Sequence, residues 1–218
     1  MDGSHLTRTL ALATHAGLAA SVVGATALHV GWSTQVDAIR QTVSDYALSE
    51  GADAVFTGTV ASLSAGSTAL LASLVHSRLP VGRTATVLLG AWCGGLVLTA
   101  SFRTDPIDSA PTAHGLIHRY ATGVAVAALP AAGLLISRRL GHLPHCRSSV
   151  RSLRRVSWAG AAAGAGFLAT HLCARRPTTA AARWVGDRHG LAERVTLALE
   201  LGVLGALAAA MCSGRSRT

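Results

Sequence analysis

The chain has 218 residues, half of them hydrophobic, and only 13% of them are charged. Soluble domains usually carry about a quarter charged residues, so this composition favours a membrane protein. The net charge of +9 comes from arginine alone, because the chain contains no lysine. These arginines flank apolar stretches and form no basic domain, which argues against a nucleic-acid-binding protein. The bias toward Ala, Gly and Arg suggests a GC-rich bacterial genome.

Six stretches are long and apolar enough, or nearly so, to cross a bilayer as helices, which takes about 20 residues. They lie at about 8–30, 54–75, 84–102, 119–137, 156–173 and 192–212. The first is longer than the apolar region of a signal peptide, so we expect it to be retained. No link is long enough to hold a separate soluble domain. The sequence therefore predicts an all-α polytopic membrane protein, a single domain over 1–218 built as a six-transmembrane-helix bundle.

The placement of arginines predicts the orientation, because cytoplasmic links carry an excess of them. The link 138–155 is the strongest signal, with Arg138, Arg139, Arg147, Arg151, Arg154 and Arg155 and no acidic residue. The Arg175–Arg176 pair in the link 174–191 argues mildly the other way. We expect a multi-pass protein of the cell membrane whose N- and C-termini are both cytoplasmic.

Cysteines and glycines each leave two interpretations open. No CxxC pair supports a zinc site, although Cys93 and Cys173 could lie near the same side and form a disulfide. Gly160 and Gly164 form a small-residue face that allows close helix approach. That face serves either packing within the bundle or a homo-oligomer.

With six alternating spans, the links 31–53, 103–118 and 174–191 share the outer side. Polar residues that can carry chemistry therefore converge at one membrane face. They are Ser44, Asp45, Asp105, Asp108, His114, His118, Arg119, His189, Glu193 and Arg194. This convergence follows from topology and is required by no single motif.

The segment His114-Gly-Leu-Ile-His118 places two imidazoles four residues apart, on one face of a helix that begins near Thr112. Two such histidines can bind a divalent metal, but a catalytic zinc site needs a third protein ligand. Asp45, Asp105, Asp108 and His189 are the candidates. The alternative is that the histidines form hydrogen bonds with backbone and carboxylate groups at the interface.

The aspartates have similar alternatives. Asp105 precedes Pro106 and either ends the helix before it or acts as a general acid or base, or as the counter-charge of Arg119. Ser44 and Asp45 either cap a short interfacial helix or place the Asp45 carboxylate at the bundle mouth.

The last span begins with His189-Gly-Leu-Ala-Glu193-Arg194. Glu193 suits a helix N-terminus, and Arg194 can hold a phosphate or carboxylate through two hydrogen bonds. Glu200 lies deeper in the span, where a carboxylate is costly and by default functional. It is expected to be protonated, or paired with His171 or His15.

Four motifs, in this order, resemble a known family of bacterial six-helix membrane proteins, the domain of unknown function 998. They are TVSDYA at 42–47, FRTDP at 102–106, HGLIH at 114–118 and GLAER at 190–194. Arg103 departs from the pattern, which usually has proline there, and Glu200 matches no family motif. The resemblance implies a six-helix fold but no known activity. A more distant similarity is to eukaryotic autophagy modulators and a GPI-lipid-remodelling factor, and it implies a lipid-related role only by analogy.

Two functions fit these residues. In the first, the protein acts on or binds a membrane lipid or isoprenoid, by proton transfer or metal-assisted chemistry. Asp45, Asp105, His114, His118 and Glu193 are then the catalytic candidates, and Ser44, Arg119, His189 and Arg194 the substrate-binding ones. In the second, the polar groups form a structural network in a non-catalytic scaffold, or a docking surface for a lipid or protein. The sequence identifies no cofactor and does not decide whether the protein is an enzyme.

Overall fold

The computed structural model describes residues 3–77, 79–106, 109–143 and 147–215, and all the regular structure in these ranges is helical. The elements are α1 (Gly3–Gly31), the 3₁₀ helix η1 (Val43–Leu48), α2 (Asp53–His76), α3 (Arg83–Ser101), α4 (Ala113–Leu140), α5 (Arg147–Arg175), α6 (Ala180–Gly186) and α7 (His189–Arg215). The predicted all-α fold is therefore confirmed.

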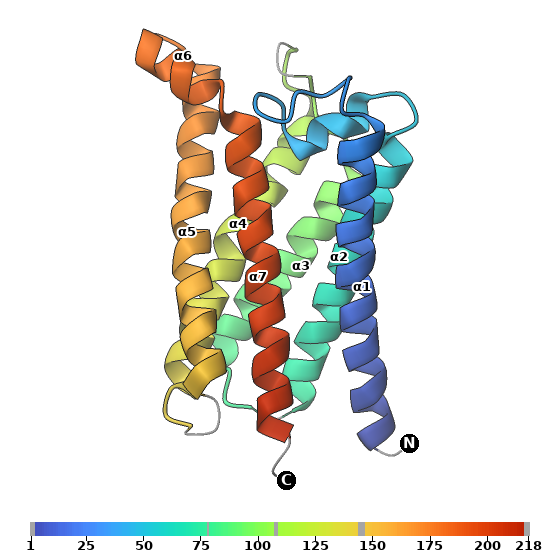
Figure 1. Cartoon of the computed structure of the whole chain (residues 1–218), viewed down its shortest axis with the longest axis vertical. Helices are drawn as coiled ribbons and strands as arrows, with labels where there is room; N and C mark the ends of the chain where they lie inside the picture. The colour runs from blue at the N-terminus through green and yellow to red at the C-terminus, as the bar shows by residue number, and fades with distance from the viewer. Residues whose placement is uncertain (1–2, 78, 107–108, 144–146, 216–218) are drawn as a thin grey trace.

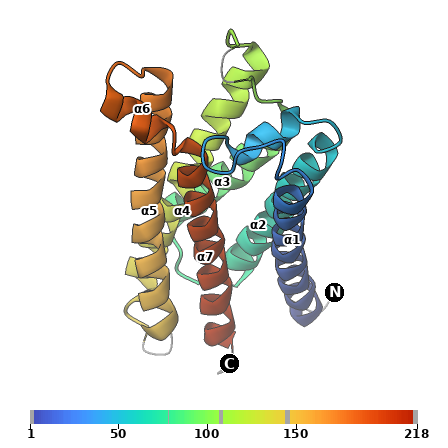
Figure 2. The ribbon, with the colours of Figure 1, turned by 45° about the horizontal axis from the view of Figure 1, so that its top comes forward.

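The six long helices run side by side along the long axis of the molecule (Figure 1). Helices consecutive in the chain pack as neighbours, α5 packs against α7, and α1 makes little contact with α7. Both termini lie at one end, while η1, α6 and the link between α1 and α2 lie at the other (Figures 1 and 2). We call the second end the outer end, and the segment 32–42 together with η1 the first link.

Among the described residues, five helices are apolar and long enough to cross a membrane: α1 from His5, α2, α3, α4 and α7 as far as Met211. Helix α5 has 29 residues but does not reach that composition. Arg147, Arg151, Arg154 and Arg155, predicted to lie in a link, belong to this helix but precede its apolar part. That part begins at Val156, and its glycines together with Ser157, Thr170 and His171 keep it less apolar than the other spans. The predicted count of six apolar spans is thus corrected to five.

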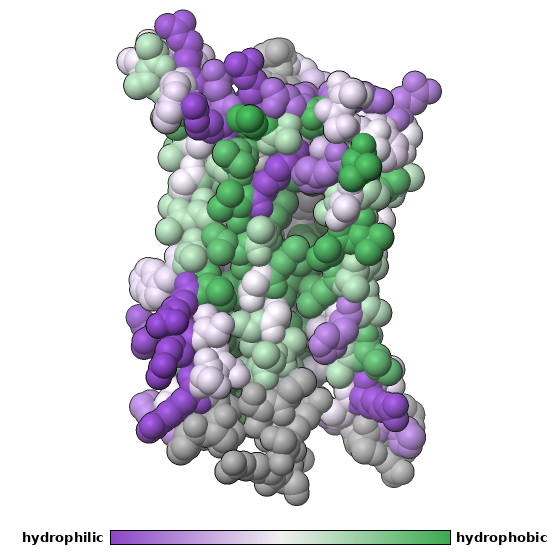
Figure 3. All heavy atoms as spheres, in the orientation of Figure 1, coloured by the Kyte–Doolittle hydropathy of each residue, from purple (hydrophilic) through white to green (hydrophobic). Residues whose placement is uncertain are grey.

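The bundle exposes apolar side chains around its middle. Val23, Val87 and Leu168 are all more than half exposed, and Figure 3 shows hydrophobic residues across the central part of the visible face with polar residues toward its ends. A soluble monomer rarely exposes so large an apolar surface. This distribution fits a protein surrounded by lipid.

Small residues bring the helices together. A Cβ on Gly17 would lie 2.6 Å from the Cα of Gly66, so the backbones of α1 and α2 are in contact there. Gly160 and Gly164 face Pro130 and Val126 of α4, which is packing within the chain; a homo-oligomer through this face stays a prediction. The suggested disulfide is wrong, because Cys93 and Cys173 are both free thiols.

We expect Gly17→Ala to destabilise the protein, because the new methyl group would force α1 away from α2. Overpacking of this kind typically costs about 1–3 kcal/mol. Gly58→Ala is the matched control, since a Cβ there meets nothing within 4 Å and alanine favours a helix by up to about 1 kcal/mol. Thermal unfolding in detergent would measure both, and equal midpoints for the two variants would contradict the close approach.

Candidate functional site

The first turn of α7 binds the backbone of the first link. The N–H of Leu191 donates to the carbonyl of Ile39 at 3.0 Å, and a carboxylate oxygen of Glu193 accepts from the N–H of Val43. Gly190 makes this approach possible, because any Cβ at that position would collide with the backbone of Gln41. The helix therefore begins directly against the link.

Arg194 completes this attachment. Its guanidinium donates to the carbonyl of Gln41 at 2.6 Å, to that of Gly190 at 3.0 Å and to Nε2 of His29 at 2.7 Å. A guanidinium can only donate, so His29 is an acceptor at Nε2 and donates from Nδ1 to the carbonyl of Ala25. The ring of Tyr46 lies 5.8 Å away. Arg194, predicted to hold a head group, instead joins α7 to α1 and the first link.

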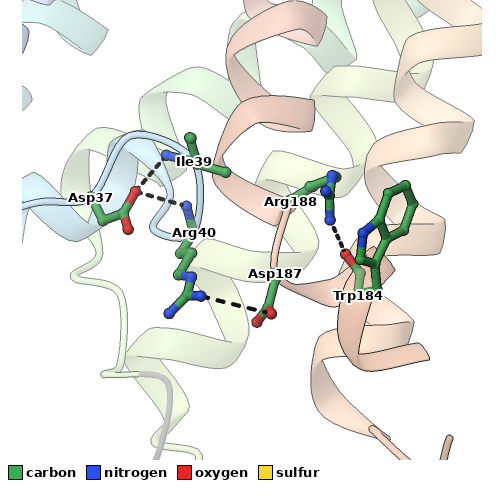
Figure 4. Close-up of polar contacts among 6 residues, drawn as sticks. All are labelled: Asp37, Ile39, Arg40, Trp184, Asp187 and Arg188. Atoms are coloured by element: carbon green, nitrogen blue, oxygen red, sulfur yellow. Dashed lines mark hydrogen bonds and ion pairs between the residues drawn. The ribbon is translucent and has the colours of Figure 1, made fainter. Parts of the chain in front are cut away.

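A weaker contact joins the first link to the turn between α6 and α7 (Figure 4). The Oδ1 atom of Asp37 accepts from the N–H groups of Ile39 and Arg40, and Arg40 lies 4.0 Å from Asp187. Arg188 stacks on Trp184, 3.5 Å from the ring centre. Both members of the Arg40–Asp187 pair are more than half exposed, so it adds little stability.

The Asp45 side chain forms hydrogen bonds at the N-terminal end of η1. Its carboxylate accepts from the N–H of Thr42 at 2.6 Å and from the Thr42 hydroxyl at 2.9 Å, and Ser44 lies 2.8 Å from that hydroxyl. The short helix was expected, but its cap is Thr42 and not Ser44. Burial raises the pKa of Asp45, against the opposing effects of the Thr42 hydrogen bonds and the positive charge of Arg194.

Asp105 organises the start of α4 and not the end of α3, which stops at Ser101. Its carboxylate accepts from the Thr112 hydroxyl at 2.6 Å and the Thr112 N–H at 2.9 Å, and Thr112 in turn caps α4 by accepting from Gly115. The side-chain and backbone hydrogen bonds from Thr112 lower the pKa of Asp105 below its ordinary 3.8. Asp108 lies outside the described residues.

The two histidines of HGLIH both contact Phe102, at the end of α3. The exposed ring of His114 packs edge-on against the Phe102 ring at 5.3 Å, and Nδ1 of the buried His118 lies 2.8 Å from the Phe102 carbonyl. Among the described residues, no three His, Cys, Asp or Glu side chains are grouped so that they could hold a metal ion. The metal alternative therefore gains no support.

The remaining predicted residues lie apart from the first link. His189 stacks on Phe167 of α5 at 4.9 Å, and its ring nitrogens lie within 3.4 Å of Thr170 and His171. It therefore joins α7 to α5. Arg119 is half-buried and has Asp105 as its acidic neighbour.

A cavity of about 110 Å³ lies beneath the first link, inside the bundle. Residues from α1, η1, α2, α3, α4 and α7 line it, and most of its walls are apolar. Of the predicted residues, Ser44, His118 and Glu193 line it. Four further residues line it that no sequence pattern predicted: Thr59, Trp92, Thr99 and Thr122. Buried hydroxyl and indole groups in apolar helices have no distinctive spacing in the sequence.

Glu200 also lines the cavity, two helical turns deeper than Glu193. It is 1% exposed, and neither carboxylate oxygen has a hydrogen-bond partner among the described residues. Pairing with His15 or His171 was therefore a wrong expectation: His15 is bound to the Ala11 carbonyl, and His171 contacts His189.

The cavity reaches the side of the bundle between α1 and α7. Ala25 of α1 and Leu197 and Leu201 of α7 line it and are only partly buried. These two helices touch little, and Figure 3 shows the surface hollowed between them. The opening therefore lies between two of the helices that are long and apolar enough to cross a membrane.

A family model described as Protein of unknown function (DUF998) matches residues 15–210. The chain belongs to this family. No curated protein and no solved structure matches the chain. The four motifs that carry the resemblance to DUF998 proteins all lie near the outer end, where Asp45, Asp105, His118 and Arg194 bind backbone groups.

In this DUF998 protein we expect Asp45→Ala to lower the free energy of unfolding by about 1–2 kcal/mol, because it leaves the buried Thr42 donors without an acceptor. Asp45→Asn keeps an acceptor oxygen and lacks the buried charge, so it should remain close to wild type. Asp53→Ala is the control, since its pair with Arg103 at 3.7 Å is exposed and worth under about 1 kcal/mol. Equal unfolding midpoints for Asp45→Ala and Asp45→Asn would show that the cap adds nothing.

We expect the stability that Asp105 contributes to be lost in acid. Its pKa is lower in the folded protein than the ordinary 3.8, so the contribution is complete above that value and disappears as the pH falls through the folded pKa. Thermal unfolding of wild type and Asp105→Asn should therefore differ at neutral pH and converge in acid. A difference that stays constant down to about pH 2 would contradict this linkage.

Proposed function

We propose that this protein is a six-span protein of the cell membrane that binds a lipid or isoprenoid through the opening between α1 and α7. The hydrocarbon chain would enter the apolar cavity, and the polar group would meet the polar side chains that line it. The observation that carries the proposal is the lateral cavity itself, which holds an unpartnered carboxyl group at Glu200. Pockets for small molecules are typically apolar with a few polar groups that fix the orientation.

In this arrangement α5 is the sixth span. Its 29 residues make a helix about 43 Å long, and the apolar part that begins at Val156 is long enough to cross the hydrocarbon layer. The arginines of its first turns then lie in the head-group region of the cytoplasmic leaflet, which places both termini in the cytoplasm. The packing of α5 along α4 and α7 supports this arrangement.

The geometry favours binding over catalysis by the residues first expected. Asp45 and Asp105 are committed to hydrogen bonds with Thr42 and Thr112, which suits a structural network. Any proton transfer to a bound ligand would fall to Glu193, Glu200 or His118, which line the cavity. The alternative is a scaffold or docking protein that binds no ligand. In such a protein the cavity would have no function.

Trp92 lines the cavity and is 1% exposed, whereas Trp158 on α5 is 58% exposed. We expect lipids brominated on the acyl chain to quench Trp92 fluorescence in nanodiscs, because quenching requires contact between bromine and indole. The measurement uses variants that keep Trp92 or Trp158 as the sole tryptophan. The Trp158 variant is the positive control for exposure to lipid.

A substitution that narrows the opening tests whether the lipid enters between α1 and α7. Ala25→Leu narrows the opening and should reduce quenching of Trp92, while Ala27→Leu, on the exposed side of the same helix, should leave it unchanged. Quenching of Trp158 without any quenching of Trp92 would overturn the proposed function.

A further inference from the structure

We infer that the ligand of this cavity carries an uncharged polar oxygen, a hydroxyl or a carbonyl, and that Glu200 donates a hydrogen bond to it. The inference rests on the proposed function and narrows its ligand class. It follows from the charges that line the cavity, from the surroundings of Glu200 and from the protons of the neighbouring hydroxyl groups.

The ionisable groups that line the cavity suit an anionic head group poorly. Glu193, Glu200 and His118 line it, and no arginine is among the described residues that do. Arg194, next to Glu193 in the sequence, directs its guanidinium to Gln41, Gly190 and His29. A phosphate or diphosphate ester would therefore meet two carboxyl groups without an arginine to balance it, and Nδ1 of His118 is already bound to the Phe102 carbonyl.

Glu200 is best suited to act as a neutral acid. An ionised carboxylate that is buried among apolar groups without a partner is far costlier than the protonated form. A protonated carboxyl has one O–H donor and retains acceptor capacity. It matches an uncharged oxygen better than it matches an ammonium group, which would require both charges to be desolvated.

The Ser and Thr hydroxyl groups that line the cavity with Glu200 along α1 to α4 already donate their protons to other groups. Thr59 donates to the Val55 carbonyl, Ser21 to that of Leu18 and Thr122 to that of His118. Because the Thr122 proton is committed, the 3.1 Å contact between Thr99 and Thr122 makes Thr99 the donor. These oxygens can now only accept.

Glu200 is therefore the donor that the deep part of the cavity offers, and hydroxyl oxygens with spare lone pairs line the same cavity. A ligand hydroxyl complements both, since it accepts from the carboxyl and donates to a hydroxyl oxygen. A ligand carbonyl complements only the carboxyl. Long-chain alcohols should accordingly bind more tightly than ketones of the same chain length.

The test uses the full-length protein in nanodiscs with Trp92 as its sole tryptophan. Four unlabelled probes with one C20 isoprenoid chain, an alcohol, a ketone, an amine and a phosphate ester, compete with the brominated lipid for Trp92. We expect the alcohol to restore the most fluorescence, followed by the ketone. Preference for the phosphate ester or the amine would overturn the inference. Absence of quenching before any probe is added would instead reject the proposed function.

Variants at Glu200 test whether its side chain acts as an uncharged hydrogen-bond donor or as a charged carboxylate. Glu200→Gln keeps a donor without charge and should bind the alcohol nearly as well as wild type. Glu200→Leu removes the donor and should weaken binding about tenfold, the effect of one hydrogen bond of this kind. Loss of alcohol binding in Glu200→Gln, or full binding in Glu200→Leu, would contradict the role of Glu200.

The unfolding midpoint of Glu200→Leu shows whether a loss of binding in this variant comes from misfolding. This substitution removes an unpartnered buried polar group and leaves a side chain of similar volume, so its unfolding midpoint should equal or exceed that of wild type. A lower midpoint would show that Glu200 has a structural partner, and would overturn the inference.

Discussion

The arrangement of the outer end depends on the contact between the first turn of α7 and the backbone of the first link. Backbone groups at the edge of a membrane need partners just as buried ones do. Glu193 provides an acceptor for the N–H of Val43, and Arg194 provides donors for the carbonyl of Gln41. Gly190 contributes by having no side chain. These contacts hold Val43 and Ser44 over the cavity, so they position its outer wall.

The charged residues of this protein differ in whether they have hydrogen-bond partners. Asp45, Asp105 and Arg194 bind backbone groups of links and helix ends, so their high density near one end reflects the need to order polar loops beside lipid. Glu200 has no such task, since no described group lies within hydrogen-bond distance of its carboxyl oxygens. A cluster of ionisable residues is thus weaker evidence for chemistry than one ionisable residue left without a partner.

Hydropathy predicted all six long helices but not their lengths. Helix α4 begins at Ala113, close to the start that the HGLIH interpretation assumed but six residues before the span that hydropathy predicted, because Thr112, held by Asp105, caps the helix there. Helix α5 extends back to Arg147 for a related reason: arginine is a good helix former even where it cannot enter the hydrocarbon. Hydropathy detects the part of a helix that lipid surrounds, and caps and propensities decide where the helix ends.

For the site, the sequence likewise predicted the positions of several residues but not their hydrogen-bond partners. Alternation of the spans correctly placed Asp45, His118 and Glu193 toward one end, but the partner of each depends on backbone geometry that no spacing specifies. Glu200 stood out in the sequence as a deep carboxyl group. Its lack of a partner, however, depends on the packing of α1, α2, α3, α4 and α7 together.

The opening of the cavity follows from how α1 packs. Contact at Gly17 and Gly66 fixes α1 closely against α2, and the same helix makes little contact with α7. Moving α1 toward α7 to close the gap would break the first contact and would seal Glu200 among apolar groups. A ligand that binds Glu200 avoids both costs, because it fills the gap and supplies the missing partner. Binding of this kind would stabilise the folded bundle by mass action, so a ligand at the proposed site would offset the cost of leaving the Glu200 carboxyl group without a partner among the described residues.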